Sequence, residues 1–503
     1  MEVLQGLFSG FSGIIQPEPF FYCFVGVLIG TLIGVLPGIG PVGTMSLLFP
    51  FTYKASPLCA MVMLAGIYYG AMYGGSTTSI LVNIPGEAAS VVTCLDGYQM
   101  ARKGRAGPAL GMAAFGSFAA GTLGLVGIML IAPPLASIAL QFGPPEYFSL
   151  MCVGLTILIY LASGSIIRAI MMATFGVILG CAGLDSETGS PRFVFGIPDL
   201  MDGIGLAPFV MGLFGISEVF LNIEKPPGRR DVLESRIKGL LPSWQDWKDS
   251  ILPITRGGIL GFFLGILPGG GAVISSFVSY AVEKKISKHP EKFGTGAIEG
   301  VAAPEAANNS ATAGAFIPMF TLGIPSNVVM ALLLGAMIVH GVTPGPRFIS
   351  ENPQIFWGIV ASMYIGNVML LILNLPLIGL WVQVLKVPYR ILFPLIILFC
   401  LVGAYSINNS TFDMAIMLIF GILGYLMRKY RYEGAPMVLA FVLGPMFENS
   451  LRQSLLLSDG SFSIFFTRPI AAGGMILTVI ILVSSIIPNL RKRRKAIPME
   501  EET

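Results

Sequence analysis

Charged residues are scarce in this chain. Only 11% of its 503 residues are Asp, Glu, Lys or Arg, against roughly 25% in an ordinary soluble domain. Histidine occurs twice, at His289 and His340, and neither belongs to an H-E-x-x-H sequence. Walker and G-x-S-x-G motifs are also missing. These absences argue against a hydrolase and an ATP-driven pump, so the sequence predicts that the protein is not an enzyme.

Cysteines are few and scattered. None of the six forms a C-x-x-C pair, so neither a disulfide framework nor a structural metal site is predicted. No cofactor is expected. The first residues carry no Lys or Arg, and no small-residue cleavage site follows the apolar run from Phe20 to Leu36, so no cleavable signal peptide is predicted.

Apolar residues, by contrast, dominate. They make up 54% of the chain, and the mean hydropathy is +0.80. A helix of about 20 apolar residues crosses the hydrocarbon core of a bilayer. The sequence therefore predicts an all-α polytopic membrane protein with about 10–12 transmembrane helices. The clearest spans are expected near residues 57–75, 109–133, 147–162, 166–182, 355–385, 390–404, 412–427 and 470–488.

Basic residues suggest how the chain is divided and oriented. The cluster from Arg491 to Lys495 follows the last span and predicts a cytoplasmic C-terminus in a bacterial inner membrane. A polar, basic stretch at 222–250 reads as a cytoplasmic linker. We therefore expect a first membrane repeat at 1–221, the linker at 222–250, a second membrane repeat at 251–490 and a tail at 491–503.

An internal repeat is the strongest signal in the sequence. Gly26 to Gly40 reads GVLIGTLIGVLPGIG, and Gly257 to Gly271 reads GGILGFFLGILPGGG, with seven of fifteen positions identical at an offset of 231. A second match follows in the same order at an offset of 240, pairing Gly74 and the sequence IPG at 84–86 with Gly314 and the sequence IPS at 324–326. Two ordered matches indicate an internal duplication.

Charge placement predicts that the repeats are inverted. In the first half, a basic cluster at 102–105 follows the second motif, whereas in the second half lysines at 284–292 follow the first motif. If both clusters face the cytoplasm, the two halves lie upside down relative to one another, with Lys54 and Arg347 outside. Such halves would supply two related conformations for alternating access, by an elevator or a rocking movement.

The repeated motif has both a structural and a functional reading. Glycines at every fourth position clear one helix face for close packing. Proline then ends the helix at membrane depth and leaves backbone groups that hydrocarbon cannot satisfy. In transporters, such breaks bind anionic groups and coupling cations, whereas a mere kink is the simpler alternative. The predicted substrate-binding residues at the breaks are Pro37, Gly38, Gly40, Pro268, Gly269 and Gly271.

Uncharged polar side chains cluster in the second motif of each half. Back-bonding of Ser and Thr to their own helix would explain any one of them, but the clusters beside broken helices favour ligand binding. The predicted substrate-binding residues here are Ser76, Thr77, Thr78, Asn83, Asn308, Asn309, Ser310, Thr312, Ser326 and Asn327. Candidates for holding the coupling cation, Na⁺ or H⁺, are Gly38, Gly269, Asn309, Ser310 and Glu305.

For other charged residues, a role in substrate or cation binding is less strongly indicated by the sequence. Glu87, Asp96 and Glu299 also lie near these motifs and could carry protons or sit at the interface. Arg168 and Arg256 could pair with a substrate carboxylate or anchor a helix end.

The motifs LPGIG, LPGGG, GGSTTSILVNIPG and APEAANNSATAGAFIPMFTLGIPSN together resemble the large membrane subunit of bacterial tripartite tricarboxylate transporters. The resemblance covers roughly residues 20–490. It implies a secondary transporter of citrate-like or other carboxylates, driven by a Na⁺ or H⁺ gradient. It also implies two partners, a small membrane subunit and a periplasmic solute-binding protein. An anion channel or a non-transporting scaffold subunit remains the alternative, although no ring of charges predicts a pore.

Overall fold

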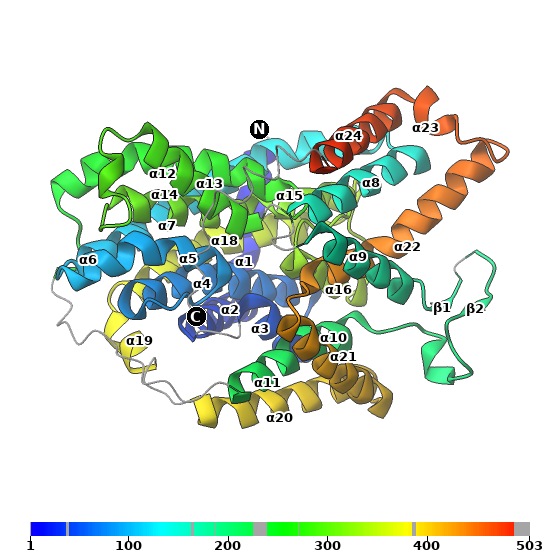
Figure 1. The fold of residues 1–503 in the computed structure, drawn as a ribbon, viewed down its shortest axis with the longest axis horizontal. Coiled ribbons are helices and arrows are strands. Elements are labelled where there is room, and N and C mark those ends of the chain that lie inside the picture. Colours follow the sequence, from blue (N-terminus) through cyan, green and yellow to red (C-terminus); the bar gives the residue numbers. More distant parts are fainter. Residues whose placement is uncertain are drawn as a thin grey trace. The chain divides into compact units, whose positions relative to one another are not determined.

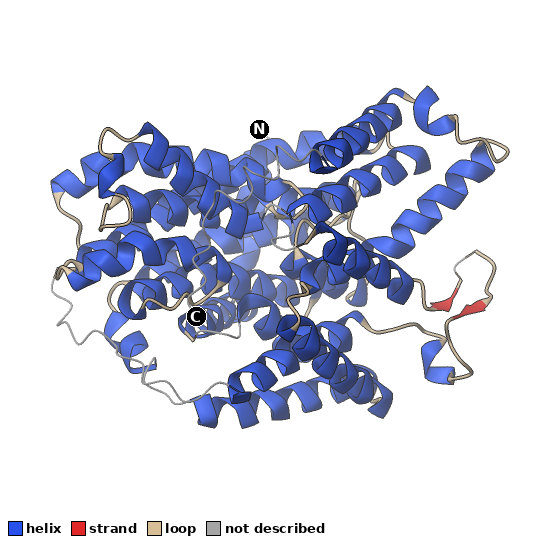
Figure 2. Cartoon of the chain, in the orientation of Figure 1, coloured by secondary structure: helices blue, strands red, loops and turns tan. Residues whose placement is uncertain are grey.

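The structure is a computed structural model, and it describes residues 2–36, 40–161, 165–185, 187–224, 239–269, 271–384 and 389–486. Helices account for nearly all of the described secondary structure (Figure 2). Two two-residue strands, β1 (Gly183–Leu184) and β2 (Pro191–Arg192), pair antiparallel in one loop. The prediction of an all-helical protein is therefore confirmed. The chain forms two compact units, each built from two separate stretches of sequence.

Unit 1 comprises Met1–Leu140 and Ile204–Tyr430 (Figure 1). Its α-helices in the first stretch are α1 (Glu2–Ile14), α2 (Pro17–Val35), α3 (Gly40–Leu48), α4 (Pro57–Val82), α5 (Val91–Thr93), α6 (Gln99–Arg102) and α7 (Ala106–Ala139). Those in the second are α10 (Leu206–Val210), α11 (Ser217–Glu224), α12 (Trp244–Ile266), α13 (Gly271–Ile286), α14 (Glu299–Gly314), α15 (Phe316–Leu322), α16 (Val328–Val339), α17 (Phe348–Glu351), α18 (Pro353–Asn374), α19 (Ile378–Val384), α20 (Tyr389–Asn408) and α21 (Thr411–Lys429). Short 3₁₀ turns (η1, Phe49–Thr52; η2, Ala88–Ser90; η6, Pro290–Lys292) and π-helical turns (η3, Cys94–Tyr98; η5, Met211–Ile216) connect or extend them.

Unit 2 comprises Gln141–Gly203 and Arg431–Thr503. Its helices are α8 (Pro144–Leu161), α9 (Ile166–Gly180), the 3₁₀ turn η4 (Pro198–Leu200), α22 (Gly434–Leu457), α23 (Ile464–Thr467) and α24 (Pro469–Ile486). α22 packs against both α8 and α9, and α24 packs against α8. Gly176 and Gly180 let α9 approach the backbone of α22, because a Cβ at either would meet a carbonyl oxygen of α22 at 2.1 or 2.3 Å.

Among the described residues, seven helical segments are long and apolar enough to cross a membrane: Pro17–Val35, Pro57–Val82, Ala106–Ala139, Leu206–Glu224, Trp244–Ile266, Pro353–Asn374 and Thr411–Lys429. Five shorter apolar helices accompany them. The multi-pass character predicted from hydropathy is thus present, whereas the count of 10–12 crossings stays a prediction. The predicted span at 355–385 is wrong as a single helix, because α18 ends at Asn374 and α19 begins only at Ile378. Pro376 lies between them and cannot continue the hydrogen-bond ladder of α18.

α4 and α14 form the interior of unit 1. All residues from Cys59 to Leu81 are buried, as are all those from Gly300 to Gly314. α2 packs along α4, and α12 and α13 pack along α14 (Figure 1). Small residues on these helices permit the close approach, and the absence of charge on most of their faces permits the burial.

The two glycine motifs pack in the same way. A Cβ at Gly26, Gly30 or Gly34 of α2 would meet the carbonyl oxygens of Met63, Ile67 or Ala71 of α4 at 2.3–2.6 Å. A Cβ at Gly257, Gly261 or Gly265 of α12 would meet those of Ala303, Ala307 or Ala311 of α14 at 2.1–2.4 Å. The contacted residues of α4 and α14 differ by 240, the offset of the second sequence match. The predicted close packing of the glycine face is confirmed, and the two helix pairs correspond residue by residue.

The correspondence continues past these helices. The residue after α4, Asn83, and the residue after α15, Gly323, cap these helices, and both have left-handed backbone, with φ of 59° and 71°. An Ile-Pro pair follows each, and then a residue that caps the next helix: Glu87 accepts from Ala89 N, and Asn327 accepts from Met330 N. Gly40 and Gly271, which begin α3 and α13, both have positive φ, of 64° and 48°. Each half therefore breaks its helices at equivalent positions.

Three loops with basic residues meet at one end of unit 1. Lys103 Nζ donates to Thr295 O at 2.6 Å, and Arg105 pairs with Asp246 at 2.5 Å. The cluster at 102–105 and the lysines at 284–292 thus lie at the same end of unit 1. That this end faces the cytoplasm stays a prediction. The middle of the predicted linker, at 225–238, and the basic tail at 491–495 lie outside the described residues.

Candidate functional site

A small polar pocket lies inside unit 1, bounded by α4, α7 and α18. The free space inside it is about 10 Å³. The residues that line it are Tyr73, Ser76, Thr77, Leu110, Ala113, Ala114, Ser117 and Asn374. The lining carries hydroxyl and amide groups but no Lys, Arg, Asp or Glu. The free space is about the room that one water molecule needs, so a carboxylate can enter only after the lining helices move apart.

Glu305 of α14 lies directly behind the pocket and is fully buried. Ser76, a pocket residue, donates its hydroxyl to Glu305 Oε2 at 2.6 Å, and Asn308 Nδ2 lies 3.2 Å from the same oxygen. Thr93 Oγ1 donates to Glu305 Oε1. Each of these partners is uncharged, so the carboxyl group has hydrogen-bond donors but no fixed positive charge among the described residues.

Asn309 connects α14 to the pocket wall. Its Nδ2 donates to Ser117 Oγ at 2.7 Å and to Glu305 O at 3.0 Å. On the next residue, Ser310 Oγ is buried but has no protein partner within the described residues, and Asn374 Oδ1 in the pocket lining has none either. Unpaired buried polar atoms are costly and rare, so these two oxygens are candidates for contact with a ligand.

The two broken segments of each half touch one another. In the second half, Gly269 N donates to Ser326 O at 2.8 Å, next to Pro268. In the first half, Gly86, the counterpart of Ser326, lies so close to α2 that a Cβ would meet Gly34 O at 2.0 Å. Pro37 and Gly38, the counterparts of Pro268 and Gly269, lie outside the described residues.

The remaining predicted site residues are not in the pocket lining. Thr78 Oγ1 donates to Val35 O at 2.7 Å across the α2–α4 contact, and Thr312 Oγ1 back-bonds to Asn308 O. Ser326 Oγ donates to Ala315 O, and Asn327 Nδ2 donates to Tyr68 Oη. Asn83 is exposed at the end of α4, and Gly40 and Gly271 begin their helices. The structure thus brings together Ser76, Thr77, Glu305, Asn308 and Asn309.

Other charged residues named from the sequence have structural partners. Asp96 is buried and accepts the backbone N–H groups of Gly294, Gly296 and Ala297 and the hydroxyl of Tyr280, so it holds the loop that precedes α14. Arg256 makes a two-pronged ion pair with Glu283, at 2.6 and 2.7 Å. This pair is consistent with α12 and α13 forming an antiparallel hairpin, because α12 ends at Ile266 and α13 begins at Gly271. Arg168 donates to Arg431 O at 3.3 Å.

Sequence reasoning missed three residues of the site. Ser117 and Asn374 are single polar residues in long apolar helices, and Thr93 belongs to a short helix after the second motif. Their only sequence signal is a polar side chain at a buried position, which many packed helices also show.

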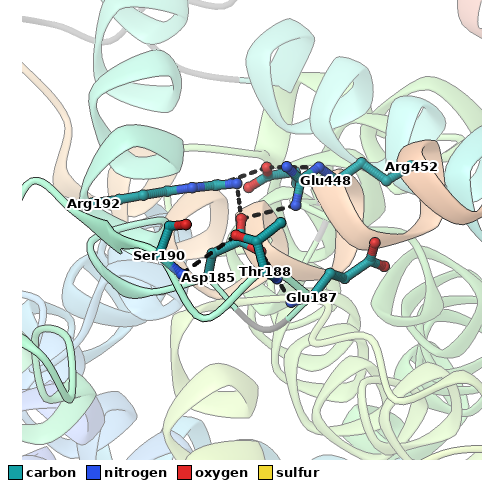
Figure 3. A network of polar contacts seen from close by, with 7 residues as sticks. All are labelled: Asp185, Glu187, Thr188, Ser190, Arg192, Glu448 and Arg452. Carbon is teal, nitrogen blue, oxygen red and sulfur yellow. Dashed lines mark hydrogen bonds and ion pairs between the residues drawn. The ribbon is translucent and has the colours of Figure 1, made fainter.

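Unit 2 holds a different kind of polar cluster (Figure 3). Asp185, next to β1, is paired with Arg192 of β2 and with Arg452 of α22, the latter at 2.8 Å. The backbone N–H groups of Glu187 and Thr188 also donate to Asp185, at 2.9 and 2.8 Å. Glu448 accepts from Arg192 at 2.7 Å. This closed ion-pair network fastens the β1–β2 loop to α22.

Comparison with known proteins decides the family. Residues 20–439 match the model of the Tripartite tricarboxylate transporter TctA family. The chain belongs to this family. It is therefore a multi-pass membrane protein of tripartite tricarboxylate transport and not an enzyme, as the motifs predicted.

Two relatives from Agrobacterium vitis are also similar to the chain. The "Uncharacterized 52.8 kDa protein in TAR-I ttuC' 3'region" is 50% identical over the full length of both chains. The "Uncharacterized protein in TAR-II ttuC' 3'region" is 52% identical over 242 residues, which are 48% of this chain and all of the relative. No solved structure matches this TctA family member.

Proposed function

We propose that this chain is the transporting subunit of a secondary carrier that imports a small carboxylate, citrate-like or another organic anion, across the bacterial inner membrane. A Na⁺ or H⁺ gradient drives it, a periplasmic solute-binding protein supplies the anion, and a small membrane subunit assembles with it. The observation that carries the proposal is the small pocket of hydroxyl and amide groups inside an apolar helix bundle, beside Glu305. Gly38, Gly269, Asn309, Ser310 and Glu305 are the proposed groups around the coupling cation.

We further propose that the two halves are inverted repeats with 10–12 crossings and a cytoplasmic C-terminus. Support comes from the directions of the equivalent helices α4 and α14. Ser76, in the last two turns of α4, bonds Glu305, in the second turn of α14, as expected for helices that run in opposite directions. The chain after α4 reaches Asp96, which bonds the loop just before α14. α4 begins at the other end, where Thr52 contacts His340.

Flux measurements test the transport proposal. The chain and its small membrane subunit are placed in proteoliposomes, and uptake of radiolabelled citrate and succinate is followed with and without the binding protein, under an imposed Na⁺ or H⁺ gradient. Accumulation that needs a gradient and the binding protein is the expected result. If citrate or succinate instead equilibrates across the membrane without a gradient and without the binding protein, an anion channel is favoured. No flux of any carboxylate would favour a scaffold subunit.

A further inference from the structure

Several buried acidic side chains of unit 1 have no basic partner among the described residues, and two of them, Glu305 and Glu87, lie beside the pocket. Glu305 is fully buried and has only hydroxyl and amide donors. Glu87 is 8% exposed, and one of its carboxylate oxygens, Oε1, is buried without a hydrogen-bond partner. An unpaired charge in an apolar interior is strongly disfavoured, so a positive charge is expected to join this site.

The two acids contact the same two segments. A Cβ on Gly75 would lie 2.9 Å from Glu87 Cγ, and the next residue, Ser76, bonds Glu305. Likewise, the Ser90 hydroxyl donates to Glu87 O, and Thr93, one turn later, bonds Glu305. Two like charges in one low-dielectric region destabilise each other, so a cation that neutralises one of them is bound more favourably.

Ser76 joins this acidic site to the pocket. It is a lining residue of the pocket, and its single hydroxyl proton is now directed to Glu305 Oε2. A hydroxyl has one donor and two acceptor positions, so it cannot donate to Glu305 and to a second anion at the same time. Since the pocket lining has no basic side chain, an incoming carboxylate would meet repulsion from Glu305 and find Ser76 occupied.

We propose that Glu305, with the hydroxyl oxygens of Ser76 and Thr93, binds one monovalent cation, a proton or Na⁺, and thereby releases the Ser76 hydroxyl to donate to a substrate carboxylate in the pocket. The inference rests on the proposed transport function and specifies its coupling site. The cation enters from the aqueous phase on one side, cancels the single negative charge of Glu305, and leaves to the other side after the anion. Because each ligand favours the other, binding is mutually cooperative.

The groups around Glu305 show which side chain in this region is expected to change its charge when a cation binds, namely Glu305 itself. Its titratable neighbours are Tyr73 on α4, and Glu87 and Cys94 on the segment after α4. On α12 and α13, Arg256 and Glu283 pair with one another, and Tyr280 bonds Asp96. On the loop before α7, Arg105 pairs with Asp246. Two of the cations near this end of the bundle, Arg256 and Arg105, are thus already paired.

Equilibrium binding tests the site. Citrate binding to the full chain, co-purified with its small membrane subunit, is measured in one series with varied Na⁺ at fixed pH and in another with varied pH without Na⁺. We expect citrate affinity to rise about tenfold or more with one of the two cations. The responsive series identifies that cation. In Glu305→Gln, because the side chain is a neutral amide, citrate affinity should not change with Na⁺ concentration or with pH. Glu291→Gln, a matched change at an exposed acid, should behave as wild type.

A second variant keeps the test decisive if Glu305→Gln does not fold. Thr93→Val removes one hydroxyl from Glu305 but no pocket residue, so it should move the cation midpoint to higher concentration and leave citrate affinity at saturating cation unchanged. A wild-type cation response in Glu305→Gln or an unshifted midpoint in Thr93→Val would overturn the inference. If the wild-type chain binds none of the carboxylates tested under any condition, the proposed function fails instead.

Discussion

Asp185 in unit 2 and Glu305 in unit 1 are both buried carboxylates, but their surroundings are opposite. The Asp185 side chain is 1% exposed and faces two arginines and two backbone N–H groups. Glu305 faces only hydroxyl and amide donors. Asp185 therefore has fixed counterions, whereas Glu305 has no basic partner among the described residues. The first arrangement holds a loop in place, and the second can respond to an ion.

Removing Asp185 should have the largest effect on stability. Asp185→Ala leaves Arg192 and Arg452 without their shared partner, and loss of one side of a buried pair costs about 3–5 kcal/mol. The arginines are 26% and 34% exposed, so water offsets part of the loss and we expect about 2–3 kcal/mol. Chemical unfolding of the purified protein in detergent measures it. Glu187→Ala, at an exposed neighbour, is the control, and equal losses in both variants would contradict the role given to Asp185.

Loss of one arginine should cost less. In Arg452→Met, Asp185 keeps Arg192 and both backbone donors, so about 1 kcal/mol is expected in the same unfolding experiment. Lys288→Met, at an exposed loop lysine, should change stability by no more than about 0.5 kcal/mol. The double variant with Arg192→Met should lose more than the sum of the two single losses, because Asp185 would then be unpaired. Simple additivity would show that the arginines do not share Asp185.

Glu305→Gln should separate stability from function. Glutamine keeps the size of the side chain and an oxygen for the Ser76 and Asn308 bonds, so the free energy of unfolding should change by less than about 1 kcal/mol. Gradient-driven accumulation in proteoliposomes should nevertheless be lost. A destabilisation as large as that of Asp185→Ala would instead make Glu305 a structural residue, and the contrast between the two acids would disappear.

Ser310→Ala should have the smallest effect on stability. Its Oγ has no partner among the described residues, so the free energy of unfolding should change by no more than about 0.5 kcal/mol. Uptake should still fall severalfold if that oxygen faces a ligand. Ser279→Ala is the matched control, because Ser279 is also buried with an unpartnered hydroxyl but was not predicted in the site. Equal uptake by both variants and wild type would remove Ser310 from the site.

Much of the fold was predictable because it follows from local rules. Long apolar runs predicted helices at α4, α7, α18 and α21, and the glycine spacing predicted close packing of α2 and α12. The division of α18 from α19 was missed, although Pro376 marks it, because hydropathy continues across the break. The pairing of Asp185 with Arg452 joins residues 267 positions apart, which no local pattern reports.

The candidate site was predictable only where residues of one kind cluster in a motif. Ser76, Thr77, Asn308 and Asn309 were found because several polar residues stand together in an apolar setting. Ser117 and Asn374 are isolated on their helices, and only tertiary packing brings them to the pocket. For Arg256 the sequence left a substrate contact and a helix-end anchor open, and the structure pairs its guanidinium with Glu283.

The glycine faces of α2 and α12 also explain why the duplication can still be read. At Gly26, Gly30 and Gly34, and again at Gly257, Gly261 and Gly265, any side chain would collide with a backbone carbonyl that cannot move aside. Mutation is therefore barred at these sites, while lipid-facing positions between them can exchange one apolar residue for another at little cost. Three of the seven identities between the first motifs are these packing glycines, so geometry that admits no side chain keeps part of the similarity between the two halves.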